Sequence, residues 1–152
     1  HTRQKFAEAN DDLVKGIKWV STLDGKTSDV CKARDGKVYP IDSGPRPPAH
    51  PNCRSSTSYV LKSWKELGID LKEFPEGTRA SMDGQVPANV TYNEWLKGKD
   101  SAFQDKVLGP TRAKLFREGM PVDRFVNKAG DRWTLKKLRE RDAEYFRKAG
   151  IA

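Results

Sequence analysis

The feature that most constrains this chain is a proline-rich segment, residues 27–54, which contains both cysteines and one of the two histidines. Its end, residues 47–54, reads Pro-Pro-Ala-His-Pro-Asn-Cys-Arg. Proline fixes its own φ and favours an extended conformation in the residue before it, so this end is expected to be a stiff loop and not a helix. The loop presents His50 and Cys53 three positions apart, and Cys31 lies upstream in the same segment.

Cysteine and histidine are ligands that zinc prefers, and a structural zinc ion normally takes four of them. Cys31, His50 and Cys53 supply three, and Asp29, two residues before Cys31, is a candidate for the fourth, with water as the other candidate. The segment therefore predicts a structural zinc site. Two further interpretations stay open: a Cys31–Cys53 disulfide, or two buried thiols beside a histidine that hydrogen-bonds the loop. A catalytic Cys–His pair lacks an orienting third group that the sequence can name.

The first half of the chain predicts an N-terminal helix over residues 2–15, where apolar residues follow a helical period, and then a small antiparallel sheet. Alternating residues and turn signals place its strands near residues 17–23, 37–41 and 54–61. A sheet this small needs a helix or a cross-link to be stable, which gives the Cys/His loop a structural purpose. Residues 1–69 are read as one domain.

The second half predicts helices. Residues 70–90 contain Pro75, Gly77, Gly84 and Pro87 and read as a linker or extended arm. Residues 91–152 read as a helical subdomain, with Thr91 and Thr134 as N-caps and Pro110 in the first turn of a helix. The expected fold is therefore α+β: a small antiparallel sheet with a Cys/His-bearing loop, an N-terminal helix and a C-terminal helical subdomain.

The order of motifs along the chain carries a family resemblance. In the first half these motifs are residues 19–24 (Trp-Val-Ser-Thr-Leu-Asp), 27–31 (Thr-Ser-Asp-Val-Cys), 35–39 (Asp-Gly-Lys-Val-Tyr) and 47–54. In the second half they are residues 91–96, 103–104, 108–112, 116–119 and 134–138. Together they resemble the Mu F-like head morphogenesis family, the minor head proteins of tailed bacteriophages. Many members carry a CxxC pair before the HxxC pair, and Ser28 stands here where they have the first cysteine.

The resemblance implies a non-enzymatic virion or prohead component that acts near the portal in head assembly, DNA packaging or DNA delivery. Its implied partners are the portal, other head proteins and DNA, and it is expected to be oligomeric only in the assembled particle. It would be located in the virion, and in the host cytoplasm during assembly. The family offers no agreed catalytic residues to carry over. Because the sequence begins at His1, we expect it to be a fragment of a longer chain.

Charge independently suggests a polyanionic partner. The 152-residue chain has a net charge of +8, and residues 111–152 hold 12 Lys and Arg against 6 Asp and Glu. Basic residues without interleaved aromatic platforms favour backbone contact without sequence readout. The candidate DNA-contacting residues are Arg112, Lys114, Arg117, Lys136, Lys137, Arg139 and Arg141. A solvated helix face, on which acids alternate with these bases, is the other interpretation that stays open.

A metal-dependent nuclease is the alternative function, because a hairpin, a His/Cys loop and a helix also occur in small zinc-bearing nucleases. Such an enzyme needs a histidine base together with further ligands for a catalytic metal. His50 is the one histidine away from the N-terminus, and the predicted zinc site engages it. This shortage favours the non-enzymatic interpretation. No apolar run approaches the roughly 20 residues of a membrane span, so no membrane partner is expected.

Overall fold

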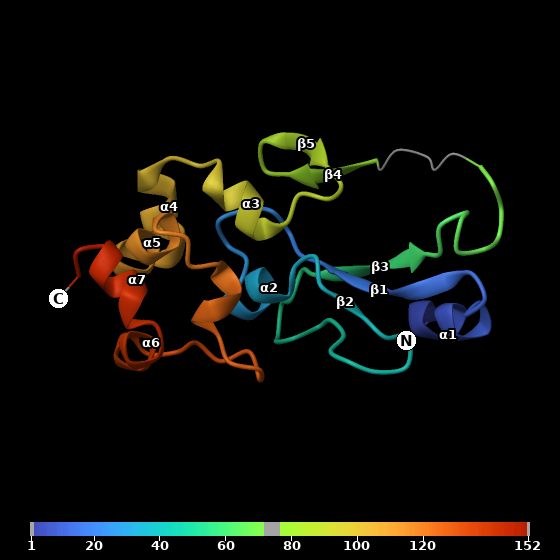
Figure 1. The fold of residues 1–152 in the computed structure, drawn as a ribbon, viewed down its shortest axis with the longest axis horizontal. Coiled ribbons are helices and arrows are strands. Elements are labelled where there is room, and N and C mark those ends of the chain that lie inside the picture. The colour runs from blue at the N-terminus through green and yellow to red at the C-terminus, as the bar shows by residue number, and fades with distance from the viewer. Residues whose placement is uncertain (1, 72–76, 152) are drawn as a thin grey trace. The chain divides into compact units, whose positions relative to one another are not determined.

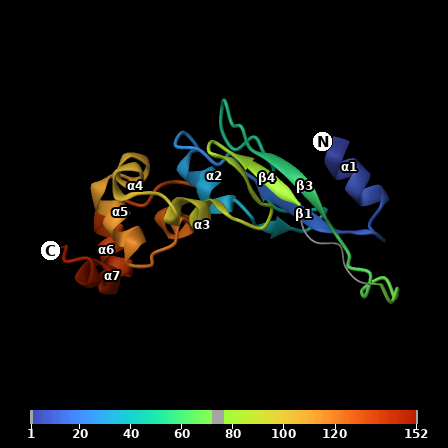
Figure 2. The same cartoon turned by 90° about the horizontal axis from the view of Figure 1, so that it is seen from above.

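The structure, a computed structural model, describes residues 2–71 and 77–151. Helices occur together with small antiparallel sheets, which confirms the α+β class (Figures 1 and 2). The chain forms two compact units, His1–Thr22 with Arg34–Val90 and Leu23–Ala33 with Thr91–Ala152.

In its described residues, the first unit contains one helix and two antiparallel sheets. Its elements are α1 (Thr2–Ala9), β1 (Val14–Val20), β2 (Val38–Tyr39), β3 (Ser56–Leu61), β4 (Thr78–Ser81) and β5 (Gly84–Pro87). The three-stranded sheet has the order β2-β1-β3, so β1 is its central strand, and β4 pairs with β5 in a separate hairpin. The register of the larger sheet sets Lys18 opposite Val38 on one side of β1 and Trp19 opposite Thr57 on the other.

The N-terminal helix is shorter than the predicted residues 2–15. It ends at Ala9, where the Asn10 side chain donates to Phe6 O at 2.8 Å and the amides of Leu13 and Val14 both donate to Asn10 O. Asparagine competes for backbone groups in this way and favours the end of a helix. Val14 therefore begins β1, three residues before the predicted strand start at residue 17.

A small apolar core joins α1 to the sheet. Ala7 of α1 is buried against Val14 and Ile17 of β1, and the half-buried Ile41 and Tyr59 pack against this cluster. The ring of Tyr59 also lies 5.2 Å from that of Phe6, measured between centroids. The helix thus covers a sheet that is too small to exclude water by itself.

The hairpin β4–β5 lies within residues 70–90, which the sequence led us to read as a linker or arm. Residues 72–76 of that segment, including Pro75, lie outside the described residues. Thr78 pairs with Pro87 at the open end of the hairpin, and Ser81 pairs with Gly84 at its turn. Gly84 has φ +114, a conformation that a glycine adopts without strain.

The second unit is helical. Its elements are α2 (Asp29–Arg34, of which Arg34 groups with the first unit), α3 (Tyr92–Lys97), α4 (Ser101–Leu108), α5 (Pro110–Arg117), the 3-10 helix η1 (Val122–Phe125), α6 (Leu135–Arg141) and α7 (Ala143–Lys148). The predicted caps are confirmed: Thr91 accepts from Glu94 N, Thr134 accepts from Lys137 N, and Pro110 is the first residue of α5. The short helix α2 carries no strong sequence signal and was not predicted.

The apolar faces of these helices form the core of the second unit. Its buried side chains include Tyr92, Trp95, Leu96, Leu108, Leu115, Phe116, Met120, Leu138 and Phe146. The predicted last helix, residues 135–148, is divided at Asp142, whose φ of −130 and ψ of 45 lie outside the helical region. Its buried carboxylate forms an ion pair with Arg124 instead. Among the described residues, no helix has the length and apolarity needed to cross a membrane.

Candidate metal centre

A capped turn positions Cys31. Asp24 accepts hydrogen bonds from Lys26 N at 2.9 Å and from the Thr27 hydroxyl at 3.1 Å, as an aspartate in a turn does. Ser28 then precedes α2, with its carbonyl accepting from Lys32 N at 2.9 Å and its hydroxyl lying 3.4 Å from Cys31 N. A serine that accepts from the amide three positions on is a typical helix N-cap. This cap holds Cys31 in the first turn of α2, where it is buried.

A second turn brings His50 and Cys53 together. The amide of Cys53 donates to His50 O at 3.2 Å, which closes a four-residue turn. Pro51 occupies its second position and Asn52 its third, with a φ of +63 at Asn52. Proline followed by a residue with positive φ is the pattern of a type II turn, and asparagine tolerates that conformation better than most residues. The sequence His-Pro-Asn-Cys therefore encodes the local geometry directly.

The residues after this turn fasten it to the end of β1. Arg54 O accepts a hydrogen bond from the Thr22 hydroxyl at 3.3 Å, and the Ser55 hydroxyl donates to Ser21 Oγ at 3.3 Å. Ser21 Oγ also accepts from the indole Nε1 of the buried Trp19 at 3.0 Å. The loop that carries His50 and Cys53 is thus anchored to the central strand of the sheet.

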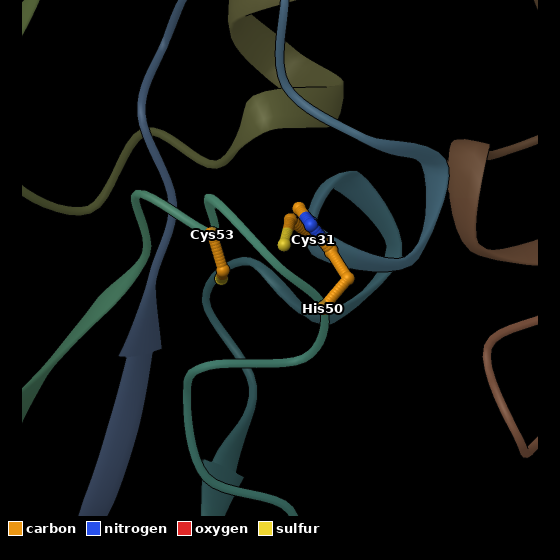
Figure 3. A group of neighbouring side chains, drawn as sticks. All are labelled: Cys31, His50 and Cys53. Atoms are coloured by element: carbon orange, nitrogen blue, oxygen red, sulfur yellow. The ribbon is translucent and has the colours of Figure 1, made fainter.

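These elements bring the predicted ligands together. One ligand atom from each of Cys31, His50 and Cys53 lies within 4.8 Å of the others, so the group can hold a metal ion (Figure 3). Zinc–sulfur bonds of about 2.3 Å and zinc–nitrogen bonds of about 2.0 Å place tetrahedral ligand atoms roughly 3.5–3.8 Å apart. The largest separation between ligand atoms, 4.8 Å, therefore has to shorten by only about 1 Å for the three residues to bind zinc tetrahedrally.

The histidine is oriented for such a role. His50 Nδ1 lies 2.8 Å from Pro51 O. A neutral imidazole that donates from Nδ1 to this carbonyl keeps the lone pair of Nε2 for a metal, and metal-bound histidines are commonly oriented by such a bond. The described cysteines, Cys31 and Cys53, are not joined in a disulfide.

Asp29, the candidate fourth ligand, lies outside this group. Its carboxylate instead forms ion pairs with Lys32 Nζ at 3.2 Å and with Arg132 Nε at 2.7 Å. Ser28, unlike Asp29, is in contact with one of the three ligand residues, since its hydroxyl lies 3.4 Å from the amide nitrogen of Cys31. In a CxxC zinc site, the first cysteine stands three residues before the second, as Ser28 stands three residues before Cys31. The described residues thus supply three candidate ligands, and Ser28 matches the first cysteine of a CxxC pair in sequence spacing alone.

The basic residues proposed to contact DNA fall into two groups. Lys114, Lys136, Lys137 and Arg139 are exposed, as are Arg117 and Arg141, whereas Arg112 is half-buried. Arg117 pairs with Asp105 at 3.2 Å, and the Arg141 guanidinium lies 4.9 Å from the centroid of the Trp133 ring. Arg112 Nη2 donates to Trp133 O at 2.8 Å. Arg112 is therefore partly a structural residue, and the others present charge to solvent.

Sequence reasoning missed the burial of three charged residues, and Asp142 of the divided last helix is one of them. The Asp35 side chain is fully buried and pairs with Arg79 at 2.9 Å. The Lys32 side chain is 5% exposed. None of these positions carries a local signal, because each depends on a partner brought close by the fold.

Comparisons with protein-family models, with curated proteins and with solved structures find no match to this chain. What the chain does must therefore be inferred from its own residues.

Proposed function

We propose that this chain is a non-enzymatic minor head protein of a tailed bacteriophage, acting near the portal in head assembly, DNA packaging or DNA delivery. Cys31, His50 and Cys53 would hold a structural zinc ion, and the exposed basic residues of the second unit would contact DNA without reading its sequence. The observation that carries this proposal is the convergence of the three ligands within 4.8 Å. The ordered motifs that resemble minor head proteins, residues 47–54 above all, supply the biological setting.

A structural role for the metal is supported by where its ligands come from. Cys31 lies on α2, and His50 and Cys53 lie on a proline-rich loop that is anchored to β1 through Arg54 and Ser55. A zinc ion would cross-link segments about twenty residues apart in the sequence, beside a sheet of three strands. Structural zinc contributes folding free energy directly, and small sheets depend on such cross-links.

The chemistry of the group argues against a nuclease. A zinc ion with three protein ligands can activate water in principle, but a hydrolase also needs a group that accepts the proton. The group contains Cys31, His50 and Cys53 and, among the described residues, no carboxylate. Its histidine would be a metal ligand and so could not act as the base.

Restoring the fourth ligand is expected to tighten zinc binding. The Ser28→Cys variant places a thiolate three residues before Cys31, and we expect at least about a tenfold increase in zinc affinity because a fourth ligand completes the tetrahedral shell. Competition with a chromogenic chelator measures this affinity. Ser43→Cys, at an exposed position between β2 and β3, adds a thiol elsewhere and is the control variant that should leave the zinc affinity unchanged. Equal affinity in Ser28→Cys and the parent chain would contradict a zinc site in this geometry.

One gel separates the proposed role from the nuclease alternative. Incubation with supercoiled plasmid and Mg²⁺ or Mn²⁺ should give a mobility shift that weakens with salt and no nicking, because contacts are to phosphates. Nicking that disappears in His50→Ala would make this chain an enzyme. Absence of both shift and nicking would contradict the DNA contact and leave a role in binding other head proteins.

Paired lysine variants test where the DNA lies. The double variant Lys114→Gln/Lys136→Gln removes two exposed charges of the second unit and should reduce the salt slope of binding by about two. Lys5→Gln/Lys65→Gln removes the same charge from exposed positions of the first unit and should not change the slope. An equal loss in both pairs would indicate attraction by net charge alone.

A further inference from the structure

Three cationic side chains of the second unit gather around one carboxylate. Lys32 Nζ lies 3.2 Å from Asp29 Oδ1, and Arg132 Nε lies 2.7 Å from Asp29 Oδ2. Arg112 is close enough for its charge to interact with both Arg132 and Asp29. The cluster thus contains three positive side chains and one negative side chain, so its net charge is +2.

Burial makes this excess costly. The Lys32 side chain is 5% exposed, with Val107 O 3.5 Å from its Nζ and the Tyr92 ring centroid 5.9 Å away. A buried ammonium group is tolerated when it is paired with a negative charge. Asp29 shares its carboxylate between Lys32 and Arg132, so it compensates neither fully.

Arg112 adds a hydrogen-bond donor that the described residues do not satisfy. Its Nη2 donates to Trp133 O at 2.8 Å, but its Nε is buried without a hydrogen-bond partner among the described residues. Burial lowers the pKa of Arg112, and the neighbouring charge of Arg132 lowers it further. An unsatisfied buried donor destabilises the folded state, and more so when the group is charged. Such a donor inside a cluster of excess positive charge suits an anionic ligand.

We propose that Lys32, Arg112 and Arg132 form a binding site for a phosphate group. Guanidinium groups match phosphate oxygens with paired donors, and an ammonium group adds a compact charge. Arg132 is 46% exposed and provides the route from solvent. Asp29 acts as the resident counter-ion, and a bound phosphate supplies the negative charge that one carboxylate cannot. This site does not depend on the proposed head role.

Titration with inorganic phosphate at constant ionic strength, with chloride as the replacement anion, tests the site. We expect saturable binding that falls at least tenfold in Arg132→Gln and is unchanged in Lys97→Gln, which removes the same charge from an exposed position of α3. Asp29→Asn should raise the affinity several-fold, because it removes the competing negative charge while keeping the side-chain shape. Opposite effects of two variants at one ion pair cannot both arise from misfolding.

A second arm identifies the source of the phosphate. If Arg132→Gln also weakens binding of a short DNA duplex, and inorganic phosphate competes with that duplex, the ligand is a backbone phosphate. If duplex binding is unchanged while phosphate binding is lost, the ligand is a free phosphate. The proposal is overturned if phosphate binds no better than chloride, if Lys97→Gln loses as much affinity as Arg132→Gln, or if Asp29→Asn does not bind phosphate more tightly.

Discussion

Replacing Arg79 with alanine is expected to lower the free energy of unfolding of the first unit by about 3–5 kcal/mol, the usual cost of leaving one partner of a buried ion pair uncompensated. The Asp35 side chain is fully buried and the Arg79 side chain is 11% exposed. Arg79 Nη1 lies 2.9 Å from Asp35 Oδ2, and Arg79 Nη2 lies 3.0 Å from Asp35 Oδ1. Removal of the guanidinium therefore leaves the Asp35 carboxylate buried, without its ion-pair partner and without contact with water.

The same guanidinium also joins three segments of the first unit. Its Nη2 donates to Ser21 O at 2.5 Å and its Nη1 donates to Val90 O at 2.9 Å. Asp35 Oδ1 in turn accepts from Ser21 N at 2.7 Å. A single side chain thus connects the hairpin strand β4 to the end of β1 and to the chain after β5. Arg79→Lys should recover only part of the loss, because lysine lacks the planar fork that makes these paired contacts.

Urea unfolding followed by tryptophan fluorescence measures this effect, since Trp19 is buried on β1. The matched control is Lys15→Ala, which removes an ion pair to Glu66 of similar length, 3.0 Å, at an exposed position. Exposed pairs contribute about 0–1 kcal/mol, so this variant should unfold close to the parent chain. A similar loss of stability in both variants would mean that the buried pair has no special role.

This ion pair also explains which parts of the fold could be predicted from sequence. Helices with local signals were found: Thr91 and Thr134 cap α3 and α6, and Pro110 begins α5, all as predicted. The hairpin β4–β5 was missed because its residues alternate only weakly and Arg79 finds its partner 44 positions away in the sequence. Non-local burial of this kind overrides local propensity and leaves no pattern within a short window.

The candidate metal centre was more predictable than the fold around it. Stiff prolines and the turn residues Pro51 and Asn52 encode the spacing of His50 and Cys53 locally, so two ligands could be paired from sequence. Cys31 is positioned by α2, a helix that the sequence did not predict. Its sulfur nevertheless lies near His50 and Cys53, as predicted. Asp29 could not be judged from sequence, because its true partners include Arg132, about a hundred residues later.

Removing zinc is expected to lower the melting temperature of this chain by about 5–10 °C. Zinc at a hundred times its dissociation constant stabilises the folded state by about 2.7 kcal/mol, and each kcal/mol shifts the melting temperature of a domain of this size by roughly 2–4 °C. Melting curves with added zinc and with a chelator measure the difference. His50→Ala and Cys53→Ser should melt at lower temperature than the parent chain, and zinc should no longer raise it.

The turn itself offers the control for this experiment. Asn52 has φ +63 and is exposed, so Asn52→Gly keeps the backbone conformation without touching a ligand. This variant should retain the response to zinc. A fall in melting temperature caused by a reducing agent, with no response to chelator, would instead point to a Cys31–Cys53 disulfide formed from these neighbouring thiols. Equal melting temperatures for His50→Ala, Cys53→Ser and the parent chain would refute a stabilising role of any kind, because a cross-link that supports a three-stranded sheet cannot be lost without cost.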